Sequence, residues 1–162
     1  MVAQRICHAR RDTNAMSQII TLMPQHLMLQ WAADHLSMPS GLWVPDSKAV
    51  GVVDKDTWTI RAVLVLNKFS TEGCEASFVS DGSRRWASAS IIAELIASPF
   101  RLFHARRVVA HVRDTDTNTQ IFCLRHGFRF EARVRAAMPD GQDAVLFSML
   151  RADVPANLLE DV

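Results

Sequence analysis

The chain has 162 residues, 49% of them hydrophobic, which favours one folded domain with a substantial core and disfavours disorder over most of its length. Its 18 basic residues nearly balance 17 acidic ones, so the charge supports neither a nucleic-acid-binding nor a membrane-surface protein. Three widely spaced cysteines, Cys7, Cys74 and Cys123, favour reduced thiols in an intracellular, cytoplasmic compartment. No apolar run approaches membrane-spanning length, and the first residues do not read as a signal peptide.

The first half of the chain predicts a strand, a helical region and three further strands. The first strand is expected over 2–8. Apolar residues recur at helical spacing over 16–37, where Pro24 fits the first turn of a second helix covering 24–36. A loop follows at 38–41. Turns at 54–56 and 70–73 then separate three apolar runs that we expect to be strands: 49–53, 58–67 and 75–80.

The second half begins with an apolar helix predicted over 88–104, which Pro99 is expected to kink or end. A β-branched run over 106–112 predicts the next strand. The Asp, Thr and Asn residues at 116–119 supply possible N-caps for a short helix, and Gly127 is placed to close it in the left-handed conformation.

Two more strands complete the pattern. Apolar and polar residues alternate over 128–135, and a second apolar run covers 144–150 after a turn at 139–141. We therefore expect one α+β domain over 1–152. The remaining tail, 153–162, is expected to fray or to lie along a partner.

The segment 106–150 resembles the C-terminal half of the GNAT superfamily of N-acetyltransferases. In that family a strand precedes Asn-x-Ala-Ser, a short apolar helix and Gly-Phe, and the next strand often carries Glu-Gly-x-x-Arg. The residues in register are Asp116 at the Asn position, Asn118 and Thr119 at Ala-Ser, Gly127 with Phe128, and 131–135 reading Glu-Ala-Arg-Val-Arg. The match is closest to the branch that acetylates N-terminal or ribosomal-protein amines and to short phage-borne members. It implies a GNAT-like fold, with a mixed, mostly antiparallel twisted sheet flanked by helices.

The resemblance also implies acetyl-CoA as co-substrate and no metal. In the family the pyrophosphate rests on a loop reading Gln/Arg-x-x-Gly-x-Gly/Ala ahead of a helix, where backbone N–H groups and the helix dipole favour an anion. This chain has Ala87 at the first glycine position, which puts a methyl group where the backbone normally approaches phosphate. Two arginines could offset that loss by pairing with phosphates. The implied cofactor-binding residues are Phe78, Val79, Arg84, Arg85, Trp86, Ala87, Ser88, Ala89, Asp116 and Asn118.

A simpler interpretation of the loop is that Arg84 and Arg85 are solvated charges and Trp86 is a core anchor. In relatives, the backbone at the corresponding strand end pairs with the pantetheine arm of acetyl-CoA. The resemblance alone assigns this role to Phe78 and Val79.

Acyl transfer to an amine needs a base, a donor for the developing oxyanion and a proton for the leaving thiolate. Glu75 is the candidate base because relatives often carry a Glu on this strand, and Asp81 is the alternative. The competing interpretation is that each of these carboxylates is only an exposed charge at the end of a strand. A backbone N–H near Val79 is the candidate oxyanion donor. Many relatives protonate the thiolate with a Tyr, but this chain has no tyrosine. Cys123 stands at the position of that tyrosine, and the competing interpretation is that it packs in the core as a small hydrophobic residue. Thr119 stands where the ribosomal-protein branch often has Ser, and it could take the part of that Ser.

Three functions remain open at this point. The first is an acetyl-CoA-dependent N-acetyltransferase that modifies a primary amine of a protein or small molecule, as a homodimer or within a protein assembly. The second is a GNAT-fold binding or structural protein without catalysis, for example a component of a phage virion. Ala87, Asp116 in place of Asn, and the missing tyrosine favour this second function. The third, an unrelated α+β binding module, requires the match over 106–150 to be accidental.

One set of basic residues has two interpretations. Arg129, Arg133 and Arg135 alternate along the predicted strand 128–135. They either line a groove for an acidic substrate or form a solvated strand face.

Overall fold

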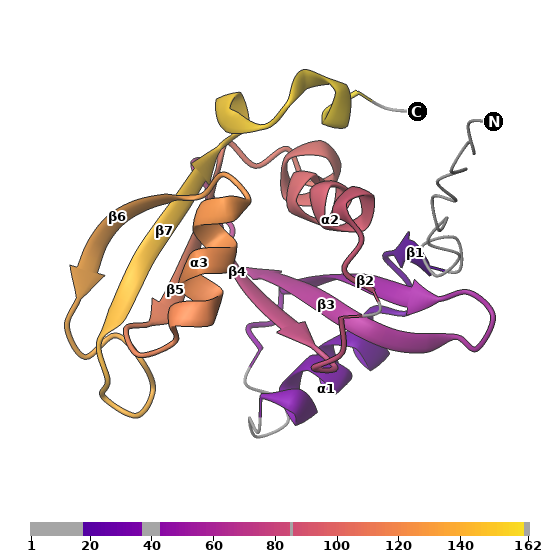
Figure 1. Ribbon diagram of the computed structural model, residues 1–162, viewed down its shortest axis with the longest axis horizontal. Helices are drawn as coiled ribbons and strands as arrows, with labels where there is room; N and C mark the ends of the chain where they lie inside the picture. The colour runs from indigo at the N-terminus through magenta and orange to yellow at the C-terminus, as the bar shows by residue number, and fades with distance from the viewer. Residues whose placement is uncertain (1–17, 37–42, 85, 161–162) are drawn as a thin grey trace, which may run out of the picture.

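The computed structural model describes residues 18–36, 43–84 and 86–160 (Figure 1). In chain order the elements are β1 (Gln18–Thr21), α1 (Gln25–His35), β2 (Lys48–Asp54), β3 (Thr59–Asn67), β4 (Gly73–Ser80), α2 (Ala89–Leu102), β5 (Arg107–Arg113), α3 (Thr117–Arg125), β6 (Arg129–Val134) and β7 (Ala144–Leu150). One sheet contains all of these strands in the order β1-β2-β3-β4-β5-β7-β6. The β4–β5 pair is parallel and the other pairs are antiparallel. The predicted α+β architecture with a mixed, mostly antiparallel sheet is confirmed.

The N-terminal region differs from its prediction. Residues 18–21, placed in a helical region by their spacing, form the short edge strand β1 instead, with Gln18 opposite Asp54 and Thr21 opposite Gly51. Pairing with β2 supplies β1 with partners for its backbone groups, and this non-local partner leaves no mark in the local sequence pattern. The second helix is confirmed as α1. The strand expected over 2–8 and the loop at 38–41 lie outside the described residues.

Side chains alternate between two faces of the sheet, and each face has its own cover. On one face Leu64 and Leu66 join the cluster beneath α2, while Val63 and Val65 on the other face pack against α1. Helix α3 lies on the same face as α2, because its Phe122 stacks at 5.7 Å on Phe78 of β4, which packs against the α2 cluster. Figure 1 shows α1 on one side of the sheet and the other two helices opposite it.

Helix α2 continues through Pro99, where the sequence predicts a kink or an end. Proline has no N–H, so the carbonyl of Leu95, four residues earlier, lacks its usual helical donor. The hydroxyl of Ser98, which is fully buried, donates to that carbonyl at 2.6 Å. This side-chain bond replaces the missing backbone bond, and the helix extends to Leu102.

We expect Ser98→Ala to lower the free energy of unfolding by about 1–3 kcal/mol, because it leaves the Leu95 carbonyl without a donor in the core. Urea denaturation measures the change. Ser90→Ala is the control, because it removes a hydroxyl whose contact with Ser88, at 3.2 Å, lies in the exposed first turn of the same helix, and it should stay within about 0.5 kcal/mol of the parent. Equal losses in the two variants would contradict this role for Ser98.

The C-terminal segment folds back onto the domain. Two short 3-10 turns, Arg151–Asp153 and Ala156–Leu158, follow β7. Val154 between them is buried, and Leu158 packs against the cluster beneath α2. The expectation of a frayed tail is therefore not met over 153–160. Among the described residues, no helix is long and apolar enough to cross a membrane.

Candidate functional site

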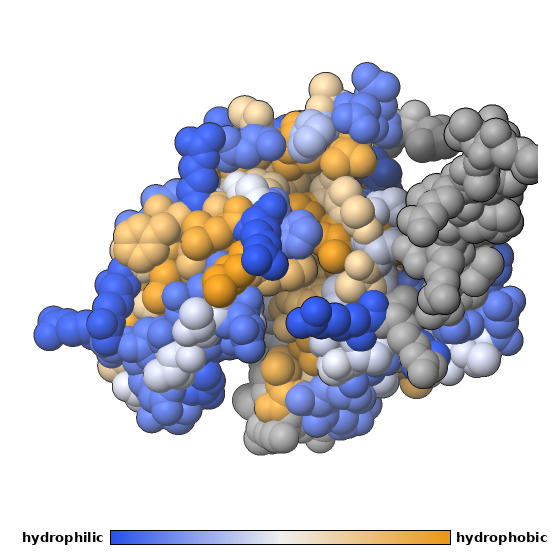
Figure 2. Space-filling model, in the orientation of Figure 1, coloured by the Kyte–Doolittle hydropathy of each residue, from blue (hydrophilic) through white to orange (hydrophobic). Residues whose placement is uncertain are grey.

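The parallel strands β4 and β5 part near the centre of the sheet. Over their described lengths the last register pair is Glu75 opposite Val109. Beyond it, β4 stays paired with β3 up to Ser80, and β5 stays paired with β7 up to Arg113. The two strands diverge in Figure 1, and Figure 2 shows a notch in the surface beside the β6–β7 hairpin. Because backbone groups alternate between the two edges of a strand, both strands present unpaired N–H and C=O groups to this gap.

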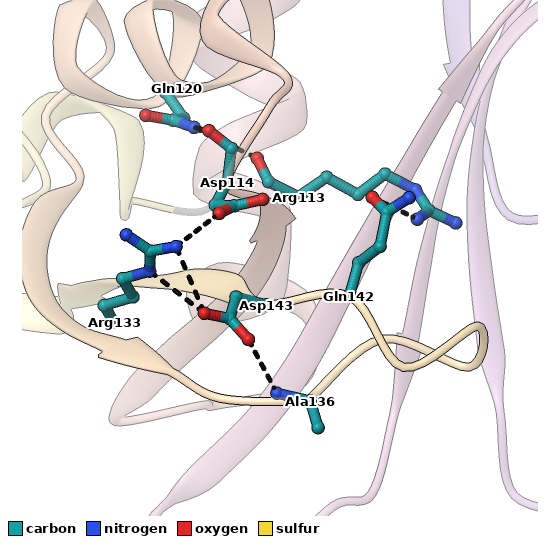
Figure 3. A network of polar contacts seen from close by, with 7 residues as sticks. All are labelled: Arg113, Asp114, Gln120, Arg133, Ala136, Gln142 and Asp143. Atoms are coloured by element: carbon teal, nitrogen blue, oxygen red, sulfur yellow. Dashed lines mark hydrogen bonds and ion pairs between the residues drawn. The ribbon is translucent and has the colours of Figure 1, made fainter.

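A polar network ties the outer end of β5 to the β6–β7 hairpin (Figure 3). The Arg133 guanidinium lies 2.8 Å from a carboxylate oxygen of Asp114 and 3.1 Å from one of Asp143. The amide of Gln120 in α3 donates to the backbone carbonyls of Arg113 and Asp114, at 3.0 Å each. The network holds the end of β5 and the start of α3 on the far side of the gap from β4. It also matches the charge of Arg133 with two carboxylates, which favours a structural role over a groove for an acidic substrate.

The end of β4 is held on the opposite side by Asp81. Its carboxylate accepts from the N–H of Ser83 at 2.8 Å and pairs with Arg61 at 3.4 Å. Burial acts to raise the pKa of Asp81, but the hydrogen bonds from Ser83 and Arg61 outweigh it and lower that pKa below its ordinary value. A carboxylate with a lowered pKa is a weaker base, so the geometry favours Asp81 as an anchor of the loop.

The loop after β4 leads into the N-terminus of α2. Ser88 is the N-cap, and its hydroxyl accepts from the N–H of Ile91. The N–H groups of Ala89 and Ser90 belong to the first turn, so they have no partner inside the helix and are available to an anion. Arg84 is exposed, and no described residue forms an ion pair with it. Arg85 lies outside the described residues.

Trp86 and Ala87 fasten this loop to the core. Trp86 is 4% exposed, and its ring lies 5.3 Å from that of Phe78. Its indole Nε1 is buried and has no hydrogen-bond partner within the part of the chain that the structure describes. Ala87 packs against the same cluster, so its methyl group faces the core. The methyl group that the sequence places at the family's first glycine position therefore does not cover the helix N-terminus.

Glu75 lies at the last paired position of β4, on the face opposite α2 and α3. Its carboxylate pairs with Lys68 at 2.8 Å, and the side chain is 30% exposed. A cavity of about 260 Å³ opens beside it. Its lining residues are Lys68, Ser70, Glu72, Gly73, Cys74, Glu75, Arg107 and Val109.

Sequence reasoning missed Lys68 and Arg107 in this cavity. A signal for Lys68 exists in the sequence, because a turn at 70–73 brings the end of β3 opposite the start of β4, and Asn67 is indeed paired with Glu75. No local signal identified Arg107, which reaches the cavity only because β5 pairs with the start of β4.

Known proteins resemble this chain in fold but not in sequence. No protein-family model matches the chain, and no curated protein is similar to it in sequence. Solved structures of spermidine N-acetyltransferase SpeG from Vibrio cholerae are similar in fold. A point mutant superposes with a TM-score of 0.70 at 9% identity, over 88% of this chain and 98% of that one. A dodecameric form gives 0.70 at 10% identity, over 88% and 98% of the two chains.

A third structure of this acetyltransferase, in complex with manganese ions, gives a TM-score of 0.68 at 10% identity, over 86% of this chain and 96% of that one. The chain has the GNAT fold. In the residues described for this chain, no group of three or more His, Cys, Asp or Glu side chains could hold a metal ion. Nothing in these likenesses distinguishes the ribosomal-protein or phage branch of the GNAT superfamily, which stays a prediction.

The GNAT motif residues at the start of α3 mainly build the helix. Asp116 is the N-cap, and its carboxylate accepts the Thr119 N–H at 3.0 Å and the Thr119 hydroxyl at 2.6 Å. Asp116 thus supplies the capping oxygen that Asn would supply in the GNAT pattern, and its second carboxylate oxygen accepts the Thr119 hydroxyl in addition. Asn118 is exposed beside them.

Cys123, at the position of the GNAT tyrosine, is 5% exposed and packs with Val112, Val145 and Phe147. Burial, together with the charge of Asp116, raises the pKa of its thiol to about 11. Such a thiol carries almost no thiolate at neutral pH and gives up its proton reluctantly. The position of Cys123 therefore supports packing rather than catalysis.

Proposed function

We propose that the chain is an acetyl-CoA-dependent N-acetyltransferase acting on a primary amine. The observation that carries the proposal is the parting of β4 from β5 just beyond Glu75, with the capped N-terminus of α2 at the open end of β4. A gap lined by unpaired backbone suits an extended amide-containing arm, and the first-turn N–H groups that the Ser88 cap leaves unpartnered suit its phosphates. Self-assembly is part of the proposal, because one fold neighbour is dodecameric.

The residues around the gap fit acetyl-CoA, which would supply a thioester as the acetyl donor. The first-turn N–H groups of Ala89 and Ser90, beside the unpaired charge of Arg84, would hold the pyrophosphate, with Arg85 as a further phosphate partner. The free backbone edge at Phe78 and Val79 would pair with the pantetheine arm. The orientation of the Ala87 methyl group toward the core leaves room for the phosphates.

The chain's own residues supply the remaining chemistry. Glu75 would take the proton of the acceptor amine, directly or through water, from the face opposite α2. A backbone N–H on the free edge of β4 near Val79 would donate to the developing oxyanion. The Thr119 hydroxyl already donates to Asp116, and Cys123 is buried, so solvent water is the best source of a proton for the leaving thiolate.

The alternative of a GNAT-fold binding or structural protein without catalysis loses two of its supports. Ala87 turns its methyl group into the core, and Asp116 caps α3 as Asn would. Only the missing tyrosine remains in its favour. The buried free thiols of Cys74 and Cys123 agree with an intracellular, reducing compartment for the enzyme.

Calorimetric titration with acetyl-CoA tests the proposal. We expect micromolar binding by the parent chain and at least about tenfold weaker binding by the double variant Arg84→Ala plus Arg85→Ala, because charge-assisted bonds to phosphate are lost. Arg135→Ala, at an exposed position in the β6–β7 hairpin, is the control and should bind as the parent does. A folded parent chain that shows no heat over a wide concentration range would overturn the enzyme proposal in favour of the non-catalytic one.

A further inference from the structure

The cavity beside Glu75 lies on the face of the sheet opposite α2, the helix whose N-terminus is proposed to hold the phosphates of acetyl-CoA. Along β4 and β5, Cys74 and Val108 face the cluster beneath α2, so their neighbours Glu75 and Val109 face the opposite side. The cavity is lined by that second set together with Cys74 and the turn before β4, and it adjoins the point where the strands part. A molecule bound there would reach Glu75 without crossing the gap proposed for acetyl-CoA.

The size of the cavity indicates a small acceptor. Its volume of about 260 Å³ lies below the range of about 300–1,000 Å³ found for drug-sized ligand sites. A small metabolite fits this space.

The charges around the cavity are balanced. Lys68 and Arg107 stand against Glu72 and Glu75, so the formal charge of the lining is zero. Spermidine, named in the fold neighbours, carries several amines and no acidic group, and a site that selects such a polycation is expected to be acidic overall. A balanced lining better matches a ligand that carries one amine and one anionic group.

Arg107 is the best candidate partner for that anionic group, because it lines the cavity and is only weakly paired within the described residues. Its Nη2 lies 3.5 Å from a carboxylate oxygen of Glu131, which is long for a charge-assisted hydrogen bond. Its Nε is buried and has no hydrogen-bond partner among the residues that the structure describes. The Arg107 side chain is 41% exposed, so part of its guanidinium is open to a ligand, and a carboxylate is the acceptor that guanidinium geometry suits best.

We propose that the acceptor is a small amino carboxylate, such as a free amino acid, whose carboxylate is bound by Arg107 while its amine faces Glu75. This inference rests on the proposed acetyltransferase function and names the acceptor class of the same site. Arg107 is then the residue that determines specificity, because it distinguishes an amino acid from the amine that lacks the acid group.

Binding is measured first, without catalysis. The probes are L-amino acids and their carboxamides, used as matched pairs, together with spermidine. We follow the arginine Nε–Hε signals of the ¹⁵N-labelled chain by NMR and assign that of Arg107 from its absence in Arg107→Gln. We expect this signal to shift with one or more amino acids and to require at least about tenfold more of the matching carboxamide, because the amide offers no charge to the guanidinium.

Steady-state kinetics give the second readout. For an amino acid that is acetylated, Arg107→Gln should lower the preference for the acid over its amide, as a ratio of kcat/KM values, by at least about tenfold. Arg106→Gln removes the same charge from the neighbouring exposed residue and should keep the preference. Arg107→Lys should restore part of it, because the charge returns without the planar fork.

The outcomes separate this inference from the function on which it rests. No shift of the Arg107 signal with any amino acid, or equal shifts with acids and amides, overturns the acceptor class even if acetyl-CoA binds. Preferential acetylation of spermidine overturns it as well. Failure of acetyl-CoA to bind, with the Arg107 signal still responding to amino acids, overturns the acetyltransferase and leaves the cavity as an amino carboxylate site.

Discussion

Glu75→Gln is expected to lower kcat by about 10²–10⁴-fold, the range typical of a lost general base, and to leave the affinity for acetyl-CoA within about twofold. The amide keeps the size of the side chain but cannot accept a proton. Glu75 sits at the last paired position of β4, whereas the groups proposed to hold phosphates lie at the start of α2, so the two effects should separate. Single-turnover acetylation and calorimetry measure them independently.

Two further variants test whether a fall in kcat reflects the loss of a general base at Glu75. Glu72→Gln removes an equal charge from the same cavity lining, so a comparable fall in kcat would show that charge alone matters. Asp81→Asn tests the other candidate base. Because Asp81 anchors the loop through Ser83 and Arg61, we expect the Asp81→Asn substitution to weaken acetyl-CoA binding more than it lowers kcat. A larger fall in kcat for Asp81→Asn than for Glu75→Gln would transfer the role of base to Asp81.

Gly73→Ala is expected to cost more than about 3 kcal/mol of folding free energy, beyond the usual cost of overpacking. A Cβ atom at Gly73 would lie 1.7 Å from the backbone oxygen of Arg107 and 2.7 Å from its carbonyl carbon. Neither atom belongs to a flexible side chain, so the two strands would have to separate. This separation would move Glu75 and Arg107, and activity should fall even where the variant still folds.

Thermal and urea denaturation measure the cost, with Gly141→Ala as the matched control. Gly141 lies in the hairpin between β6 and β7 and adopts φ +80°, and a Cβ atom added there would meet no other atom within 4 Å. Its substitution therefore reports only the strain of a left-handed backbone, about 1–2 kcal/mol. Similar losses at the two glycines would show that β4 and β5 can accommodate a side chain at their junction.

Local patterns were sufficient for most of the C-terminal half. Gly127 closes α3 with φ +90°, as expected from its place after a short apolar segment. The alternation over 128–135 corresponds to β6, and the loop Arg-x-x-Ala-x-Ala leads into a helix capped by Ser88. Each of these features depends on residues within about two turns of chain, which is the range that periodicity and capping describe.

Features that depend on distant partners were not predictable in the same way. Residues 18–21 form a strand only because β2 is beside them, and α2 continues past Pro99 because Ser98 happens to face the Leu95 carbonyl. The anchoring of Asp81 requires Arg61, twenty residues earlier in the chain. Sequence patterns place such side chains on a face of an element but do not identify what lies across from them.

The burial of Trp86 has a spectroscopic consequence. The chain has four tryptophans and no tyrosine, so its intrinsic ultraviolet emission comes from indole rings alone. Trp58 is largely exposed, whereas Trp86 is enclosed beside Phe78 at the base of the loop that precedes α2. Indole emission responds to polarity and to hydrogen bonding at Nε1, and in Trp86 this atom has no partner among the described residues. Replacing Trp58 by phenylalanine would reduce the emission from exposed indole. The wavelength of maximum emission would then respond to changes in the surroundings of Trp86, and so to ligand binding at this loop, in real time and without a label.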